Sequence, residues 1–329
     1  MSKLKRIGVL TSGGDSPGMN ACIRAVVKAG IGKGINVFGI EDGYKGMIEG
    51  RIRQLTYMDV NNIIHLGGTI LGTARSEAFR TLEGREQAVA NLKKHEIEAL
   101  ILIGGDGTYA GGMALTKEFD IPIIGLPGTI DNDIHGTDFT IGYDTCLNTV
   151  VEAVDKIRDT ASSHHRVFFV EVMGRASGYI ALNSAIASGA ESVLIPETLT
   201  EIQLLAKEIK NQNKGIRSSI IIVAEGDEEG GAKEIMEKVK PYLEGYELRY
   251  SVLGHIQRGG SPSAFDRILA TRMGVKAVDL LIEGKKSLMI GQIGRDLVCR
   301  NILEGTTGNV STDDSGIELL KSLLTKGNF

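Results

Sequence analysis

The chain has 329 residues, a formal net charge of −4, 42% hydrophobic residues and 24% charged residues. This composition is that of a globular protein with two domains or one large α/β unit, and it excludes disorder of the whole chain. The chain has no overall positive charge that would favour nucleic-acid binding. No apolar run reaches the roughly 18 residues of a membrane span. No apolar leader follows Met1–Leu10, and Cys22, Cys146 and Cys299 are too scattered for a disulfide framework, so we expect a reduced, cytoplasmic setting.

Short β-branched runs alternate along the chain with helix-length amphipathic segments. Apolar runs such as Ala99–Ile103 are typical of strands covered on both faces of a parallel sheet. The alternation predicts an α/β fold with doubly wound, mostly parallel sheets. The predicted strands are Arg6–Thr11, Asn36–Glu41, Ala99–Gly104, Pro122–Leu126, Val167–Val172, Ser192–Ile195, Ser219–Ala224 and Glu247–Val252. The predicted helices are Pro17–Lys33 (with Ser16 as candidate N-cap), Arg85–His95, Tyr109–Glu118, Cys146–Asp159, Glu201–Asn213 and Ala264–Glu283.

No linker rich in proline or serine divides the chain, so two domains would have to be compact lobes joined by crossing connections. The polar stretch Thr129–Asp138 and the segment near Ser251 are the best candidates for these crossovers. We therefore predict a larger lobe from residues 1–138 plus 251–305 and a smaller lobe from residues 139–250 plus 306–329.

Glycine is the compositional outlier, with 43 residues, and the glycines cluster where predicted strands end. Ligands of open α/β sheets bind beyond the carboxyl ends of the strands, so these loops should converge. Nearly every predicted strand is followed by glycine and a charged residue, a pattern that a purely structural protein does not need. The loops are Gly13–Asp15, Asp42–Tyr44, Gly104–Thr108, Pro127–Asp133, Met173–Arg175, Glu225–Asp227 and Gly254–Gly260.

The loop Gly104–Thr108 lies between an apolar strand and a predicted helix. Glycines there let backbone N–H groups approach a phosphate, and the helix N-terminus adds about half a positive charge. No Gly-Lys-Ser/Thr follows, so the loop is not a Walker A sequence. Gly105, Gly107 and Ala110 match the loose G-x-G-x-x-A dinucleotide pattern, but no acidic residue ends the next strand, and Asp106 suits Mg²⁺ better. A plain glycine turn is the alternative interpretation.

Two carboxylates, Asp131 and Asp133, follow the fourth predicted strand in the sequence Thr-Ile-Asp-Asn-Asp. One of them can accept a proton from a substrate hydroxyl while the other holds Mg²⁺, directly or through water. Alternatively, the Asp-Asn-Asp sequence forms an Asx turn with a purely structural role.

Arginines gather near strand ends and in the glycine-rich loops. Their planar fork binds two phosphate oxygens at once, which indicates a locally positive site in an acidic protein. Solvated surface ion pairs are the alternative for any single one. The arginines are Arg75, Arg80, Arg166, Arg175, Arg249 and Arg258, the last lying three residues after His255.

Taken together, the order and spacing of these loops from Ile7 to about Leu303 closely resemble the family of ATP-dependent 6-phosphofructokinases of the bacterial short-chain type. The resemblance implies a phosphofructokinase-like fold of two doubly wound lobes, the larger binding ATP and the smaller binding sugar phosphate. It also implies transfer of the γ-phosphoryl group from Mg-ATP to the 1-hydroxyl of fructose 6-phosphate. The products would be fructose 1,6-bisphosphate and ADP, in the committed step of glycolysis.

The same resemblance assigns roles to individual residues. Asp131 would be the catalytic base beside Thr129, Arg75 and Arg175 would neutralise the transferring group, and Asp106 with Asp133 would bind Mg²⁺. ATP would contact Gly14, Tyr44, Arg75, Ser76, Gly105, Asp106, Gly107, Thr108 and Gly111. The sugar phosphate would contact Thr129, Ile130, Asp131, Arg166, Met173, Gly174, Arg175, Glu225, Arg249, His255, Ile256, Gln257 and Arg258.

Subunit contacts and regulation follow from the resemblance as well. In the family, the counterparts of Arg166 and Arg249 act from a neighbouring subunit, which implies a homotetramer. An effector site for ADP or phosphoenolpyruvate would use Arg24, Lys28, Arg158, Gly189, Ala190, Glu191, Lys214, Ile216, Arg217 and Ser218. Lys28 stands where arginine is common, and Tyr57 and Ile216 replace cations, so we expect weakened or altered effector control.

The phosphoryl donor is predicted from two small residues. Family members that use pyrophosphate carry an aspartate and a lysine where this chain has Gly107 and Gly128, so ATP is favoured. The alternatives are a pyrophosphate-dependent enzyme, a lipid or nicotinamide-dinucleotide kinase with the same Gly-Gly-Asp-Gly-Thr loop, and a non-catalytic sugar-phosphate sensor. The arginine set and the loop His255–Gly260 disfavour the other acceptors, and the intact Asp106, Asp131 and Asp133 disfavour the sensor.

Overall fold

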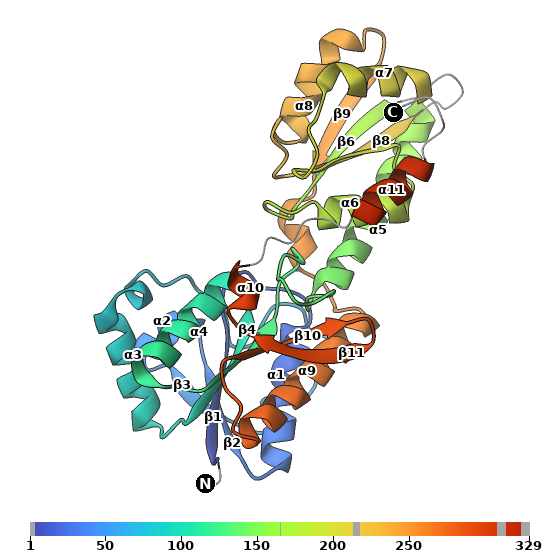
Figure 1. Cartoon of the computed structure of the whole chain (residues 1–329). Coiled ribbons are helices and arrows are strands. Elements are labelled where there is room, and N and C mark those ends of the chain that lie inside the picture. Colours follow the sequence, from blue (N-terminus) through green and yellow to red (C-terminus); the bar gives the residue numbers. More distant parts are fainter. Residues whose placement is uncertain (1–3, 165, 213–217, 308–313, 324–329) are drawn as a thin grey trace. The chain divides into compact units, whose positions relative to one another are not determined.

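The computed structural model describes residues 4–164, 166–212, 218–307 and 314–323 (Figure 1). The chain divides into two compact units. Unit 1 consists of residues 1–130, 134–145 and 258–309, and unit 2 of residues 131–133, 146–257 and 310–329. The short segment Asp131–Asp133 therefore packs with unit 2 although unit 1 segments flank it in sequence. The assignment of ATP to one lobe and sugar phosphate to the other stays a prediction.

Seven strands form one sheet among the described residues of unit 1, in the order β11-β10-β5-β4-β1-β2-β3. The five central strands are parallel, and the edge strands β3 and β11 pair antiparallel with their neighbours. The strands are β1 (Arg6–Thr11), β2 (Asn36–Ile40), β3 (Ile52–Leu55), β4 (Ala99–Gly104), β5 (Ile123–Pro127), β10 (Leu288–Ile293) and β11 (Asp296–Asn301). All four loops that follow β1, β2, β4 and β5 consequently leave one edge of the sheet.

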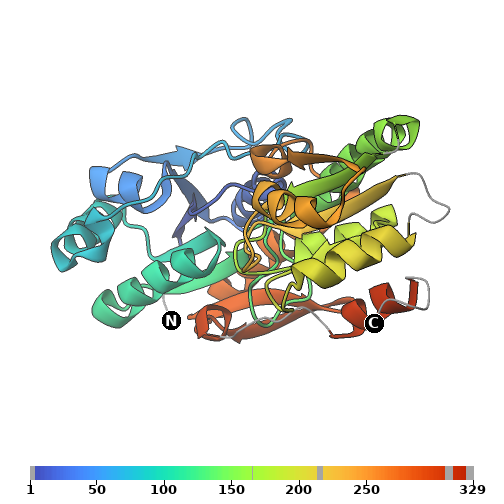
Figure 2. The same ribbon diagram turned by 90° about the horizontal axis from the view of Figure 1, so that it is seen from above.

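Helices cover both faces of this sheet (Figure 1; Figure 2 gives the perpendicular view). Ile101 and Ile103 of β4 pack in a cluster with α1 (Met19–Gly32) and α9 (Ala264–Ile282). Leu100 and Leu102, which alternate with them, pack on the opposite face in a cluster that includes residues of α2, α3 and α4. Those helices are α2 (Gly43–Glu49), α3 (Leu82–Lys94) and α4 (Asp106–Phe119). The short helices η1 (Ala78–Arg80), just before α3, and α10 (Glu304–Thr307), after β11, belong to the same unit.

Unit 2 contains a four-stranded parallel sheet in the order β7-β8-β6-β9, counted over its described residues. Its strands are β6 (Arg166–Val172), β7 (Ser192–Leu194), β8 (Ser219–Ala224) and β9 (Glu247–Val252). One face is covered by α7 and α8, whose Leu205, Ile209 and Ile235 pack on Phe169 and Ile221. The helices are α5 (Tyr143–His164), α6 (Tyr179–Ser188), α7 (Ile202–Gln212), α8 (Ala232–Val239) and α11 (Asp314–Leu323), with short helices η2 (Lys240–Tyr242) and η3 (Gly254–Arg258).

The predicted α/β class and the predominance of parallel strands are confirmed. One local prediction is wrong: Ser16 does not cap α1, which begins at Met19 after Gly18 in a left-handed conformation (φ 107°). The Ser16 hydroxyl donates instead to the Ile141 carbonyl at 2.8 Å, a bond across 125 residues that no local pattern reveals. No helix in the described part of the chain is long and apolar enough to span a membrane.

We predict that Gly104→Ala destabilises the protein and that its neighbour Gly105→Ala does not. A Cβ at Gly104 would lie 2.4 Å from the Ser12 carbonyl oxygen, which is backbone and cannot turn away, whereas nothing lies within 4 Å of a Cβ at Gly105. The expected loss for Gly104→Ala is about 1–3 kcal/mol. Urea midpoints of the two variants measure the difference, and equal midpoints would contradict the packing at the end of β4.

Candidate functional site

The loops after β1 and β4 meet at the N-terminus of α4 in unit 1. The Thr108 hydroxyl donates to the Ser12 carbonyl at 3.1 Å, and the Thr73 hydroxyl donates to the Gly13 carbonyl at 2.6 Å. The predicted ligand contact Thr108 is thus almost fully buried, and its hydroxyl holds the two loops together.

The first turn of α4 offers an anion site. Gly105 precedes the helix, and Asp106 and Gly107 are exposed at its start. An added Cβ at Gly105 or Gly107 would meet nothing within 4 Å, so space is open directly over the turn. The first amides of a helix lack acceptors inside the helix and carry its positive dipole end, which is the arrangement that binds phosphate.

Tyr44 lies under this turn rather than on its surface. Its ring stacks on Phe79 with centroids 4.0 Å apart, and its hydroxyl donates to the Thr108 carbonyl. A Cβ at Gly111 would come within 2.7 Å of the Tyr44 ring, so glycine is required there for close packing. Burial raises the pKa of the Tyr44 phenol, which keeps its proton available for donation. Phe79 was not among the predicted site residues, since an isolated aromatic residue carries no motif.

Two predicted phosphate contacts from distant parts of the sequence lie together in unit 1. A Cβ added to Gly14 would stand 3.3 Å from a terminal guanidinium nitrogen of Arg258, and Arg258 is only partly buried. The Arg258 fork therefore rests against the loop after β1. Arg75, also in unit 1, is exposed, and Ser76 accepts a hydrogen bond from the Phe79 amide at 3.3 Å.

In unit 2, the predicted base Asp131 lies beside Arg175. The Arg175 guanidinium Nε is 3.3 Å from Asp131 Oδ2, and the Asp131 side chain is 5% exposed. Gly174 and Arg175 have positive φ values of 141° and 55°, so the chain turns sharply after β6. Glu225, at the end of β8, accepts hydrogen bonds from the Gly174 and Arg175 amides at 3.3 and 2.9 Å. A carboxylate and a guanidinium are thus fixed at the carboxyl ends of parallel strands.

Gln257 was predicted to contact the sugar phosphate, but its side chain lies in the interior of the protein. It is fully buried in unit 2, where its Oε1 accepts from the Met173 amide at 3.2 Å and its Nε2 donates to the Gly254 carbonyl at 3.0 Å. The neighbouring His255 and Ile256 are exposed. The Gln257 side chain therefore holds the loop 254–258 against the end of β6, and the residues beside it are the ones that face solvent.

Arg166 and Arg249 are not brought to the cluster around Asp131. Arg166 is the first residue of β6 and Arg249 is the third of the neighbouring parallel strand β9. Both form ion pairs with Glu247, Arg166 at 3.0 Å, and Glu247 was not predicted. The seven residues of β6 span roughly 20 Å at 3.3 Å per residue, so Arg166 lies at the end of the strand opposite Met173.

The predicted effector residues are divided between the units. Arg24 and Lys28 are half-buried residues of α1 in unit 1. In unit 2, Arg158 pairs with Glu191 at 3.0 Å and donates to the Ser188 and Gly189 carbonyls at 3.0 and 2.9 Å, just before Ala190. The Ser218 and Ser162 hydroxyls lie 3.3 Å apart. Lys214, Ile216 and Arg217 lie outside the described residues.

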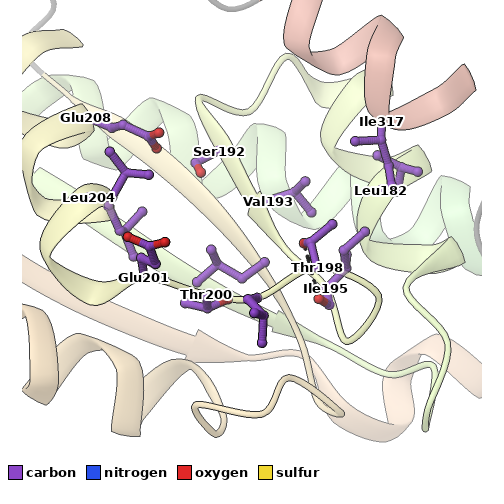
Figure 3. Close-up of a pocket in the computed structure, with 13 residues that line it drawn as sticks. Leu182, Ser192, Val193, Ile195, Thr198, Thr200, Glu201, Leu204, Glu208 and Ile317 are labelled. Atoms are coloured by element: carbon purple, nitrogen blue, oxygen red, sulfur yellow. Dashed lines mark hydrogen bonds between the residues drawn. The ribbon is translucent and has the colours of Figure 1, made fainter. Parts of the chain in front are cut away.

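A cavity of about 270 Å³ in unit 2 contains none of the predicted site residues. Figure 3 shows its mostly apolar side chains, among them Leu182, Ile195 and Ile317, with Glu201 and Glu208 beside them. Burial raises the pKa of the Glu208 carboxyl. A lining without arginine, lysine or glycine amides is unsuited to phosphates, so this cavity is not a candidate for the predicted chemistry.

The described residues contain no group of three or more histidine, cysteine or acidic side chains placed to hold a metal ion. Mg²⁺ that is bound together with phosphates takes only one or two protein carboxylates and keeps waters and substrate oxygens. Of the two predicted Mg²⁺ ligands, Asp106 is exposed at the start of α4 in unit 1 and Asp133 is half-buried in unit 2.

Comparison with known proteins agrees with this geometry. The family model described as Phosphofructokinase matches residues 6–281. The chain is 56% identical over 292 residues to ATP-dependent 6-phosphofructokinase 2 of Bacteroides thetaiotaomicron, covering 88% of this chain and 90% of that protein. It is 52% identical over 321 residues to ATP-dependent 6-phosphofructokinase of Bacillus subtilis, covering 97% and 99%. The chain belongs to the phosphofructokinase family.

Solved structures show the same fold. Phosphofructokinase of Pichia pastoris in the T-state superposes with a TM-score of 0.87 at 37% identity, over 98% of this chain and 37% of that chain. The chain thus spans well under half the length of that yeast protein. A pyrophosphate-dependent phosphofructokinase from Marinobacter aquaeolei superposes with a TM-score of 0.84 over 99% of this chain and 93% of that chain, and at 21% identity this likeness concerns the fold alone.

We predict opposite effects for two tyrosine-to-phenylalanine changes in the same hydrophobic cluster. Tyr44→Phe removes the bond to the Thr108 carbonyl and is expected to cost about 1 kcal/mol of stability. Tyr109→Phe removes a buried hydroxyl that finds no partner among the described residues, so stability should stay equal or rise. Urea unfolding of both variants distinguishes the two. A larger loss for Tyr109→Phe would refute the assigned hydrogen bonding.

Proposed function

We propose that the chain is an ATP-dependent 6-phosphofructokinase, which transfers the γ-phosphoryl group of ATP to the 1-hydroxyl of fructose 6-phosphate in glycolysis. The observation that carries the proposal is the nearly buried Asp131 carboxylate 3.3 Å from the Arg175 guanidinium, at a turn fixed by Glu225. Curated relatives more than half identical over most of their length bear this name. A cytoplasmic setting, expected from the sequence, is part of the same proposal.

Asp131 acts as the general base for the acceptor hydroxyl. It takes the proton of the sugar 1-hydroxyl while that oxygen forms a bond to the γ-phosphorus, and the bond between the γ-phosphorus and the β–γ bridging oxygen breaks to release ADP. Arg175, held by its ion pair and by the Glu225 cap, neutralises charge on the transferring oxygens together with the exposed Arg75. Thr129 and Ile130 precede the base in sequence and line the acceptor in this proposal.

The remaining sugar-phosphate contacts come from two loops. The sugar phosphate contacts the turn Met173–Arg175 and the exposed His255 and Ile256. The buried Gln257 side chain links these two loops by accepting a hydrogen bond from the Met173 amide. Arg258 binds phosphate oxygens from its place against Gly14. Planar arginine forks are suited to such oxygens because they donate two parallel hydrogen bonds.

ATP binds over the first turn of α4 in this proposal. The open space above Gly105 and Gly107 supports a nucleotide rather than pyrophosphate, since an aspartate at Gly107 would project into that space. Gly128 is more confined: a Cβ there would lie 3.0 Å from Ile103 and 3.1 Å from Met19. Gly14, Ser76 and Gly111 complete the predicted nucleotide contacts, with Tyr44 supporting the turn from below.

Mg²⁺ would be held by Asp106, with Asp133 assisting directly or through water. The bound ion supplies positive charge to the phosphate oxygens. The position of Asp106 as the first residue of α4 keeps its carboxylate beside the helix amides that hold the phosphates, so the aspartate offers an oxygen ligand without closing the anion site.

A homotetramer is part of the proposal because of where two arginines lie. Arg166 and Arg249 stand near the amino ends of β6 and β9, about one strand length from the turn at Met173. Their shared partner Glu247 keeps both guanidinium groups on one patch of the unit. We propose that this patch serves the sugar-phosphate site of a neighbouring subunit.

The reaction predicts a sharp effect for Asp131→Asn. The amide is nearly the same size but cannot accept the proton, so kcat with ATP should fall about 10³-fold or more while KM for both substrates changes little. Coupled detection of ADP with ATP or with pyrophosphate as donor measures this. Asp138→Asn, an acid-to-amide change at an exposed residue whose carboxylate accepts from the Gly294 amide at 2.7 Å, is the matched control and should keep wild-type kcat.

A normal kcat in Asp131→Asn would remove the base from the mechanism. Turnover with pyrophosphate alone would overturn the size argument at Gly107 and Gly128. If neither donor supports turnover while fructose 6-phosphate still binds, the protein is a sensor rather than an enzyme.

Control by ADP or phosphoenolpyruvate is expected to be weak. Two nitrogens of Arg158 already bond Glu191 and the last carbonyls of α6, and Tyr57 stands where the family commonly has a cation. Either effector should therefore shift half-saturation by fructose 6-phosphate less than about fivefold, the lower end of ordinary coupling. Saturation curves with each effector added measure this, and a strongly cooperative shift would contradict it.

A further inference from the structure

Three helix N-termini meet around one buried aspartate, Asp266, in unit 1. Asp266, in the first turn of α9, is fully buried. Its Oδ1 accepts from the Gly142 amide at 2.8 Å, and its Oδ2 accepts from the Thr145 amide at 2.8 Å and the Thr145 hydroxyl at 2.6 Å. Gly18, the N-cap of α1, lies so close that a Cβ there would stand 3.6 Å from Asp266 Cβ.

The donors of these hydrogen bonds show what Asp266 does for α5. Because α5 begins at Tyr143, the Gly142 and Thr145 amides belong to its N-terminus, where amides lack acceptors inside the helix. Asp266 therefore caps α5 from another helix, 121 residues further along the chain. An acid three residues into a helix ordinarily bonds back to its own N-cap amide, and here it does not.

The capping is reciprocal. The Ser263 amide, which an acid at the position of Asp266 would ordinarily bind, donates to the Thr145 hydroxyl at 2.9 Å. The Ser263 hydroxyl donates to Asp144 Oδ2 and accepts from the Asp266 amide at 3.2 Å. Each helix thus supplies the acceptors that the start of the other lacks, with the Thr145 hydroxyl as the common atom.

Burying a charged carboxylate at this position is energetically unfavourable. Burial raises the pKa of Asp266 to about 6, the hydrogen bonds from Thr145 and Gly142 oppose the rise, and the nearby Asp144 adds to it. An uncharged side chain would avoid this cost, but an amide cannot accept with both of its heavy atoms. Only a carboxylate offers two oxygens that can accept all three hydrogen bonds from Gly142 and Thr145.

The two capped helices start where the chain passes between the units. After Thr145 the chain leaves unit 1 along α5, and at Arg258 it returns to unit 1, five residues before the N-cap of α9. Arg258 is the residue whose guanidinium rests against Gly14. One hydrogen-bond network therefore ties an exit of the chain from unit 1 to a point of return.

We propose that Asp266 is a positioning residue that, through Thr145 and Ser263, holds the start of α5 and the loop 254–260 in register, and thereby places Arg258 for the sugar phosphate. This inference rests on the proposed function for its catalytic consequence. Its structural part, the coupling of two segments more than a hundred residues apart, stands independently of the substrate.

The test compares Asp266→Asn and Thr145→Val with two controls. Thr145→Ser keeps the hydroxyl that both helices share. Glu171→Gln makes the same acid-to-amide change at a carboxylate that caps another helix from outside, since Glu171 accepts from the Ala232 amide at the start of α8 at 2.9 Å. Hydrogen exchange of the peptides covering 140–150 and 254–263 is measured for each variant, followed by steady-state kinetics with ATP and fructose 6-phosphate.

Asp266→Asn and Thr145→Val should speed amide exchange about tenfold in both peptides and raise the half-saturating fructose 6-phosphate concentration about tenfold. Half-saturation by ATP should change less than about twofold, and Thr145→Ser should behave as wild type. Glu171→Gln should leave exchange of both peptides and both KM values unchanged, because its amide oxygen can still accept from Ala232. If Asp266→Asn fails to fold, Thr145→Val carries the same comparison.

Faster exchange confined to one of the two peptides, or KM values equal to those of Glu171→Gln, would overturn the inference and leave Asp266 a purely structural acid. Wild-type protein inactive on fructose 6-phosphate would refute the proposed function instead, and the exchange data would still decide whether the network couples the two segments.

Discussion

Backbone segments at the carboxyl ends of the strands approach one another more closely than any side chain permits, and the rest of the site depends on that approach. A Cβ at Gly226 would lie 1.9 Å from the Arg175 carbonyl oxygen, and one at Gly104 would lie 2.4 Å from that of Ser12. The first contact fixes the turn that presents Arg175 to Asp131, and the second fixes the start of α4. Close packing of loops thus explains glycine at these positions, whereas Gly105 and Gly107 border open space.

Two buried aspartates serve this arrangement in different ways. Asp131 pairs with a guanidinium at a strand end, where a group on the substrate can reach it in the proposed reaction. Asp266 is surrounded by helix N-termini, and every described bond that its carboxylate accepts comes from the Gly142 and Thr145 groups. Burying either carboxylate is unfavourable without such partners. In the proposed reaction the first therefore takes part in the chemistry, and in our further inference the second holds the surrounding geometry.

Sequence reasoning succeeds where burial leaves a local pattern. The apolar run of β4 and the glycine–acid loops after β1, β4 and β6 predict the parallel sheets and the loops that follow them. It misses β3 (Ile52–Leu55), a half-polar edge strand, and α2 (Gly43–Glu49), which begins on a glycine. It also misses the strands β10 and β11 and the helices α6, α8, α10 and α11, although β10 is mostly buried. It also misses Phe79, Glu247 and Asp266, and the interior position of the Gln257 side chain. Their partners are distant in sequence, so only the folded chain reveals them.

The most direct test of the account is the fate of a radioactive γ-phosphoryl group on ATP, followed in the wild-type protein with and without fructose 6-phosphate. The account predicts that the label moves to carbon 1 of the sugar, one label for each ADP formed, and that almost none is released as inorganic phosphate, because the acceptor hydroxyl rather than water lies at Asp131. Label released as inorganic phosphate at the same rate whether or not the sugar phosphate is present would contradict it.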